Sequence, residues 1–147
     1  MKILFVTLTA LFSLFNTKSF ATDVKISPVV LESFSTSFED ASEVKWSVSN
    51  ELYRADFNFN DQYISAYFDA GGNIVAEVKN ITSLQLPLCL QKGLKKHLQN
   101  LWITELFEVN NNEGTSYYVT LENADTKLVL KSTGTAGWST FQKQRKS

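Results

Sequence analysis

Apolar residues recur along this chain first with a helical period and then with a period of two, and this succession occurs twice. Val30, Phe34 and Phe38 lie at the spacing of one helix face, and Pro28 precedes them at a position where proline begins helices. From Val44 the apolar positions alternate with polar ones, which is typical of half-buried strands. The strands of the first half are predicted at about 44–49, 53–59, 63–68 and 74–78.

The second succession opens at Pro87. Leu90, Leu94 and Leu98 form another helical stripe, and Gly93 within it indicates close packing against the helix. Further strands are predicted at about 104–109, 115–122, 127–131 and 138–141.

The apolar pattern of the two halves matches at a constant offset of 64 residues, so that Phe34 corresponds to Leu98. Such register across several elements predicts one supersecondary unit used twice. We therefore predict an α+β fold made of two tandem units, each with one helix plus a four-stranded antiparallel sheet, with the helices on one face of the sheet. The units are predicted at about 29–80 and 86–144.

The N-terminus carries the pattern of an export signal. Lys2 precedes an apolar run at 3–15, and Ala21 closes a stretch with small residues at the positions that a signal peptidase reads. We predict a signal peptide at 1–21, a single domain at 22–147, and no membrane span after cleavage. The predicted location is periplasmic or secreted.

Composition narrows the function classes. The chain has 14 basic and 15 acidic residues. Loss of Lys2 and Lys18 with the signal peptide would leave a mildly acidic domain. Such a domain lacks the basic surface that nucleic-acid binding needs. Cys89 is the single cysteine, so no internal disulfide can form. The full chain contains 11 Phe, and we expect the domain to bury a sufficient core without a disulfide, with Cys89 buried on a helix flank.

Residues that could catalyse a reaction or bind a metal are few. His97 is the one histidine, and on the predicted helix it lies about 12 Å from Cys89 along the axis, too far for contact. Zinc sites need several His or Cys ligands, and the chain has one of each. The spacing of Asp69, Gly71 and Asn73 matches only the start of a calcium-binding loop. We predict no catalytic residue, no cofactor and no metal site.

The strand residues on the sheet face opposite the helices give a clearer indication of function. If the apolar positions face the helices, the opposite face carries tyrosines with scattered cations, together with Val75 and Glu77. Tyrosine gives large contact area at low entropic cost and is typical of protein-recognition surfaces, although β-propensity alone would also place it there. We expect the tyrosines of this face to be exposed to solvent. The candidate binding face consists of Arg54, Tyr63, Tyr67, Tyr118, Lys127 and Lys131.

Four segments carry a resemblance to a known family. They are VKW at 44–46, YRADF at 53–57, YISAYFDAGGNIVAE at 63–77 and LPLCLQKGLKKHL at 86–98. These segments resemble the PepSY-like, β-lactamase-inhibitor-like proteins exported by Bacteroidetes-type bacteria. The resemblance implies a secreted, non-enzymatic domain related in fold to β-lactamase inhibitory proteins, which bind an enzyme through a concave sheet. It does not imply inhibition of a β-lactamase, because no contact residue of an inhibitor can be matched.

Together these patterns predict an exported, non-enzymatic binding module, such as an inhibitor or modulator of an envelope or secreted protein, that holds a protein or peptide partner on its open sheet face. Two alternatives remain. One is a structural or stress-linked envelope protein without a specific ligand. The other is a small envelope hydrolase that uses dispersed carboxylates, which a pocket joining two of them would favour. Its candidate carboxylates are Asp56, Asp61, Glu77, Glu108 and Glu122.

Overall fold

The computed structural model describes residues 24–147, so the predicted signal peptide at 1–21 lies outside the described residues. The first elements are α2 (Pro28–Ser37), β1 (Ser42–Ser49), β2 (Leu52–Phe59), β3 (Gln62–Phe68) and β4 (Ile74–Asn80). They are followed by a short 3₁₀-helix η2 (Ser83–Gln85), α3 (Leu88–Lys95), β5 (Trp102–Asn111), β6 (Gly114–Glu122), β7 (Thr126–Ser132) and β8 (Ser139–Arg145).

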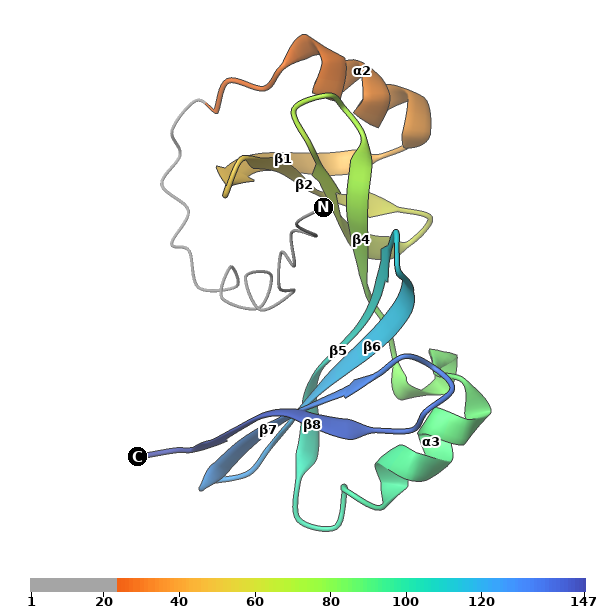
Figure 1. Ribbon diagram of the computed structural model, residues 1–147, viewed down its shortest axis with the longest axis vertical. Helices are drawn as coiled ribbons and strands as arrows, with labels where there is room; N and C mark the ends of the chain where they lie inside the picture. Colours follow the sequence, from red (N-terminus) through yellow and green to blue (C-terminus); the bar gives the residue numbers. More distant parts are fainter. Residues whose placement is uncertain (1–23) are drawn as a thin grey trace, which may run out of the picture.

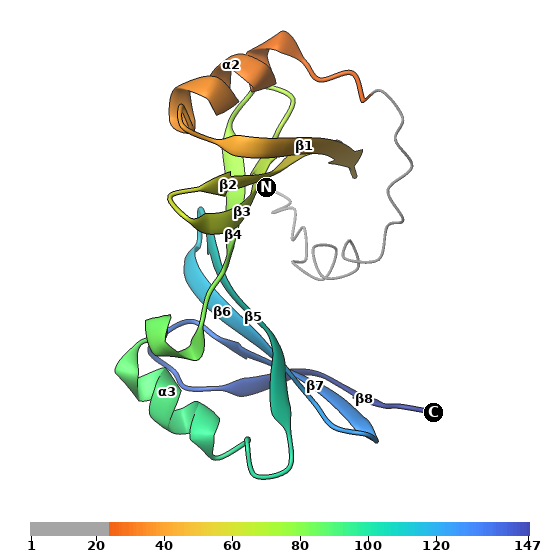
Figure 2. The same ribbon diagram turned by 180° about the vertical axis from the view of Figure 1, so that it is seen from behind.

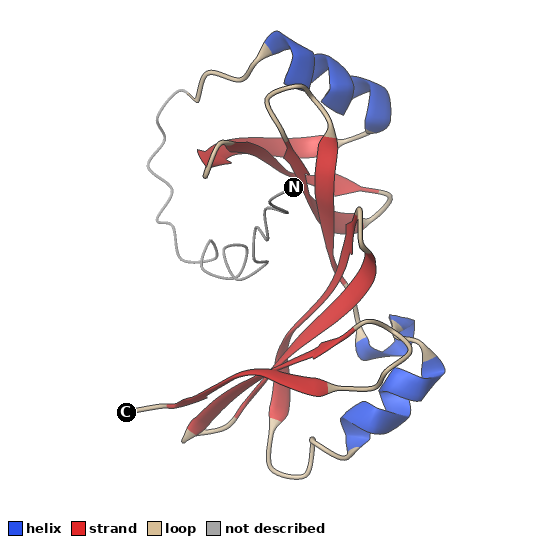
Figure 3. Ribbon diagram, viewed as in Figure 1, coloured by secondary structure: helices blue, strands red, loops and turns tan. Residues whose placement is uncertain are grey.

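The strands form one eight-stranded antiparallel sheet whose spatial order follows the chain order (Figure 3). β4 pairs directly with β5, where Val78 lies opposite Val109. The prediction of two tandem units, each with its own four-stranded sheet, is therefore wrong. A sheet that ended at β4 would leave a row of unpaired backbone N–H and C=O groups, and pairing with β5 satisfies them.

The sheet is curved, and α2 and α3 both lie on its outer side (Figure 1). β1 and β8 project away from the helices at its two ends, as the view from behind also shows (Figure 2). We call the inner side of this curve, which neither helix covers, the concave face.

The helices pack on two separate clusters of the outer face. Phe34 of α2 is buried and makes edge-to-face contacts with Trp46 and Phe57. Leu90 and Leu94 of α3 are buried in a second cluster with strands β5, β6 and β7. The match at an offset of 64 does not extend to the helices, since α2 begins at Pro28 and α3 at Leu88.

A third buried cluster lies on the concave face and gives the sheet a core on both sides. Its members come from β3 to β7, and they are Tyr67, Ala76, Val78, Phe107, Val109, Tyr118 and Val129. Burial on the inner side is a consequence of the curvature, because bending a sheet brings the side chains of its inner face together.

A register shift changes which residues of β4 face inward. Tyr67 pairs with Ala76 but Phe68 pairs with Ile74, so Val75 is an extra residue in β4. Beyond this bulge Glu77 pairs with Ala66, a core residue of the outer face. The assignment of Glu77 to the concave face is therefore wrong, because one inserted residue reverses the alternation.

Helix α3 also differs from expectation at its cysteine. Cys89 is exposed, with its thiol 3.5 Å from the carbonyl oxygen of Gly134, so the expected burial is wrong. Leu90 and Leu94 face the core, and the neighbouring position 89 points about 100° around the helix from Leu90. The close packing predicted at Gly93 is confirmed, since a Cβ there would lie 3.2 Å from Cδ1 of Trp138.

Candidate binding groove on the concave face

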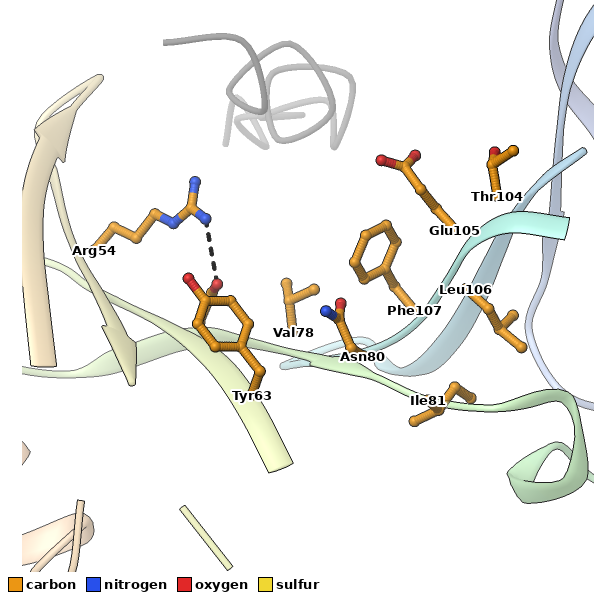
Figure 4. Close-up of a pocket in the computed structure, with 10 residues that line it drawn as sticks. Arg54, Tyr63, Val78, Asn80, Ile81, Thr104, Glu105, Leu106 and Phe107 are labelled. Atoms are coloured by element: carbon orange, nitrogen blue, oxygen red, sulfur yellow. Dashed lines mark hydrogen bonds between the residues drawn. The ribbon is translucent and has the colours of Figure 1, made fainter. Parts of the chain in front are cut away.

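A groove with a cavity volume of about 460 Å³ lies where β3, β4 and β5 cross the concave face (Figure 4). Strands β2 to β5 provide nearly all of its lining. The lining residues are Arg54, Tyr63, Ser65, Val78, Asn80, Ile81, Thr104, Glu105, Leu106 and Phe107.

A polar network holds one end of the groove. Nε of Arg54 donates a 2.8 Å hydrogen bond to Oδ1 of Asp56, and Nη2 of Arg54 lies 2.8 Å from the same oxygen. The hydroxyl of Ser65 donates to that oxygen at 2.5 Å and accepts from Nη2 of Arg54 at 3.3 Å. The guanidinium also lies 5.7 Å above the ring of Tyr67, a cation–π distance. Arg54 is thus held by charge, hydrogen bonds and an aromatic face.

The two tyrosines of β3 remain protonated at neutral pH. Burial raises the pKa of the Tyr67 hydroxyl above its ordinary value of 10.0. Partial burial, with a contribution from the Asp56 carboxylate, raises the pKa of Tyr63 in the same way. Tyr63 therefore presents a neutral hydroxyl and an aromatic ring to the groove.

Glu105 and Thr104 stand at the other end. The register of β5 shifts between Ile103 and Glu105, which places Thr104 as an extra residue beside Glu105. The hydroxyl of Thr120, a buried residue of β6, donates a 3.1 Å hydrogen bond to Oε2 of Glu105. This bond fixes the carboxylate at the edge of the groove.

Solved structures share this fold. A BLIP-like protein from Bacteroides fragilis superposes with a TM-score of 0.69 at 17% identity, over 83% of this chain and 87% of that chain. One of the "putative periplasmic proteins" from Bacteroides eggerthii superposes with a TM-score of 0.74 at 14% identity, over 83% and 90%. A DUF2874 family protein from Bacteroides uniformis gives a TM-score of 0.72 at 17% identity, over 82% and 90%.

The chain has a BLIP-like fold. The likeness to Bacteroides proteins of this type, first indicated by four sequence segments, is confirmed for the fold. No protein-family model matches the sequence, and no curated protein matches it.

In the BLIP-like fold, the six residues of the predicted binding face do not form one site. Arg54 and Tyr63 line the groove, and Tyr63 is 45% exposed. Tyr67 is only 2% exposed and Tyr118 only 1%, so the expected exposure of these two tyrosines is wrong. Both belong to the buried cluster of the concave face, because the curvature packs them against neighbouring strands.

The two lysines of the predicted face lie on β7, outside the groove lining. The ammonium of Lys131 lies 5.4 Å above the ring of Tyr118, and that of Lys127 lies 3.7 Å from Oε1 of Glu122. They form a second polar region on the far side of the buried cluster.

Sequence reasoning missed several groove residues. Glu105 and Phe107 were not singled out, although both lie in a predicted strand. Their inward direction depends on the bulge at Thr104, and a one-residue bulge leaves no signal in the apolar pattern.

The groove does not bring together the carboxylates that a hydrolase would need. Its lining includes none of the five candidates, and Asp56 behind it is paired with Arg54. Among residues 24–147, no group of three His, Cys, Asp or Glu side chains could hold a metal ion. No helix in this part of the chain is long and apolar enough to cross a membrane.

Proposed function

We propose that this protein is an exported, non-enzymatic binding module whose single domain, 22–147, holds a protein or peptide partner on the concave face of its sheet. The observation that carries the proposal is the groove on the face that neither helix covers. Its exposed aromatic residue, Tyr63, lies beside the fixed guanidinium of Arg54. Tyrosine and arginine are enriched among the residues that dominate protein–protein binding energy.

The arrangement of apolar and polar groups also supports binding. Phe107 and Val78 form an apolar floor, and polar side chains stand at both ends of the groove. Protein interfaces have this organisation, with an apolar centre surrounded by a polar rim. Within the predicted face, Arg54 and Tyr63 would contact the partner, whereas Tyr67 would support Arg54 from below.

Export is the second part of the proposal. The apolar run near the N-terminus supports it, as does the fold shared with one of the "putative periplasmic proteins" from Bacteroides eggerthii. The full chain should be expressed in a Gram-negative host and recovered from the periplasm. N-terminal sequencing should then find Thr22 first, and retention of Met1 in the recovered protein would contradict export.

Binding can be tested with the exported protein as bait for envelope extract. A captured protein supports the proposal only if Tyr63→Ala weakens its binding by about tenfold or more without lowering the thermal stability of the bait. The matched control is Leu84→Ala in η2, which also removes an exposed apolar side chain but lies outside the groove. Equal binding by the wild type and both variants would overturn the proposal.

A further inference from the structure

We propose that the groove receives a lysine or arginine side chain of the partner, with Glu105 as its counter-ion. This inference rests on the proposed function and specifies the chemistry of the partner. Among residues 24–147, the groove lining contains two charged side chains, those of Arg54 and Glu105, which lie at opposite ends (Figure 4). Which of them can attract a charged partner depends on what each already contacts.

The charge of Arg54 is already balanced. Asp56 lies 2.8 Å from Nη2 of Arg54 and accepts a hydrogen bond from its Nε, and both side chains are largely buried, at 15% and 17% exposure. An opposite charge at this distance cancels most of the field that either ion would project. An acidic partner would therefore gain little from Arg54.

The charge of Glu105 is not balanced by a cation in the same way. The ion pairs among residues 24–147 join Arg54 to Asp56, and Lys127 and Lys146 to Glu122, whereas Glu105 accepts a hydrogen bond from the neutral hydroxyl of Thr120. A fixed carboxylate beside low-dielectric walls concentrates its field in the groove and attracts positive charge.

The walls suit the carbon stem of a basic side chain. The stems of lysine and arginine cover apolar surface while their charged ends stay with a polar partner. Val78 and the rings of Tyr63 and Phe107 line the path between the two ends of the groove. Aromatic faces also attract cations directly. An acidic side chain would instead meet Glu105, and a neutral one would remove water from the carboxylate without compensation.

A phage-displayed library of random linear peptides, selected on the exported protein, provides the probe. Peptides that bind the wild type and lose binding on Tyr63→Ala should be enriched in Lys or Arg. Glu105→Gln should lower the affinity of these peptides by about tenfold or more, since the substitution replaces a charge-assisted contact by a neutral one. Glutamine retains the size of the side chain and an acceptor for Thr120.

The matched control is Glu113→Gln, which removes the same charge from the exposed turn between β5 and β6 and should leave binding unchanged. Charge reversal by Glu105→Lys should shift the selection toward acidic peptides. Groove-dependent peptides without Lys or Arg, or peptides indifferent to Glu105→Gln, would overturn this inference and leave the proposed function standing. If selection yields no peptide that depends on Tyr63, both are contradicted.

Discussion

Nε1 of Trp138 donates a 2.9 Å hydrogen bond to the backbone carbonyl oxygen of Leu90. The bond ties the segment before β8 to helix α3, and the ring lies against Gly93. Trp138→Phe removes the donor but leaves most of the ring contact. We expect the free energy of unfolding, measured by urea denaturation, to fall by about 1 kcal/mol.

Trp102→Phe is the matched control, since Trp102 is 58% exposed. We expect a change below about 0.5 kcal/mol there. Equal effects at the two tryptophans would contradict the anchoring role of Trp138.

We expect Leu94 to stabilise the packing of helix α3 more than Leu98 does. The offset of 64 equates Leu98 with the buried Phe34, but α3 ends at Lys95 and Leu98 is only partly buried. We expect Leu94→Ala to cost about 2–5 kcal/mol of unfolding free energy, Phe34→Ala about 3–5 and Leu98→Ala distinctly less than either. Urea denaturation of the three variants checks this order, and a cost at Leu98 as large as at Leu94 would contradict it.

The turn between β3 and β4 requires glycine at position 72. Gly72 has a φ of +82°, and a Cβ there would lie 3.0 Å from the carbonyl oxygen of Val29 in α2. Gly72→Ala should therefore lower the free energy of unfolding by more than the roughly 1–2 kcal/mol cost of a left-handed residue alone. Gly114→Ala is the control, because Gly114 also has a positive φ, +117°, but a Cβ there would meet nothing within 4 Å beyond its chain neighbours. Thermal unfolding that ranks Gly114→Ala as the more damaging would contradict the contact with Val29.

The C-terminal lysine contact should make stability depend on pH. A hydrogen bond from Lys146, 2.6 Å from Oε2 of Glu122, is the main cause that holds the pKa of Glu122 below its usual 4.5. Because the folded-state pKa is lowered, the stabilisation is present above the unfolded pKa and is lost as the pH falls through the folded-state value.

Urea midpoints of the wild type and Glu122→Gln should therefore differ by a constant amount above about pH 6 and converge on acidification below about pH 4.5. Lys146→Met should show the same convergence, because it removes the other half of the contact. A difference that widens on acidification would contradict the lowered pKa.

The sequence predicted local features better than global ones. Alternation in β2 and β3 correctly separates Arg54 and Tyr63 from Ala55 and Ile64, since no bulge interrupts the pairing of these strands. The hairpin turn between β2 and β3 also follows from local sequence, because asparagine and aspartate favour two-residue turns, and Asn60 and Asp61 both have the positive φ that such a turn requires.

Three features of the structure could not be predicted from the pattern of apolar residues. The pairing of β4 with β5 joins segments separated by α3, and periodicity carries no information on such a contact. The bulges at Val75 and Thr104 reverse side-chain direction without a compositional signal. The curvature of the sheet then decides burial. Tyr67 lies on the face opposite the helices, as predicted, but it is packed among its neighbours instead of exposed.

A sheet whose spatial order repeats its chain order has a consequence for how the molecule assembles. Every strand pair except β4–β5 is a hairpin between consecutive segments, and such pairs form with little loss of loop entropy. The pairing of β4 with β5 instead requires the longer segment between them, which contains η2 and α3, to bring its two ends together. The groove spans this junction, with Val78 on one side and Phe107 on the other, so the binding surface is completed only by the step that closes the longest loop in the sheet.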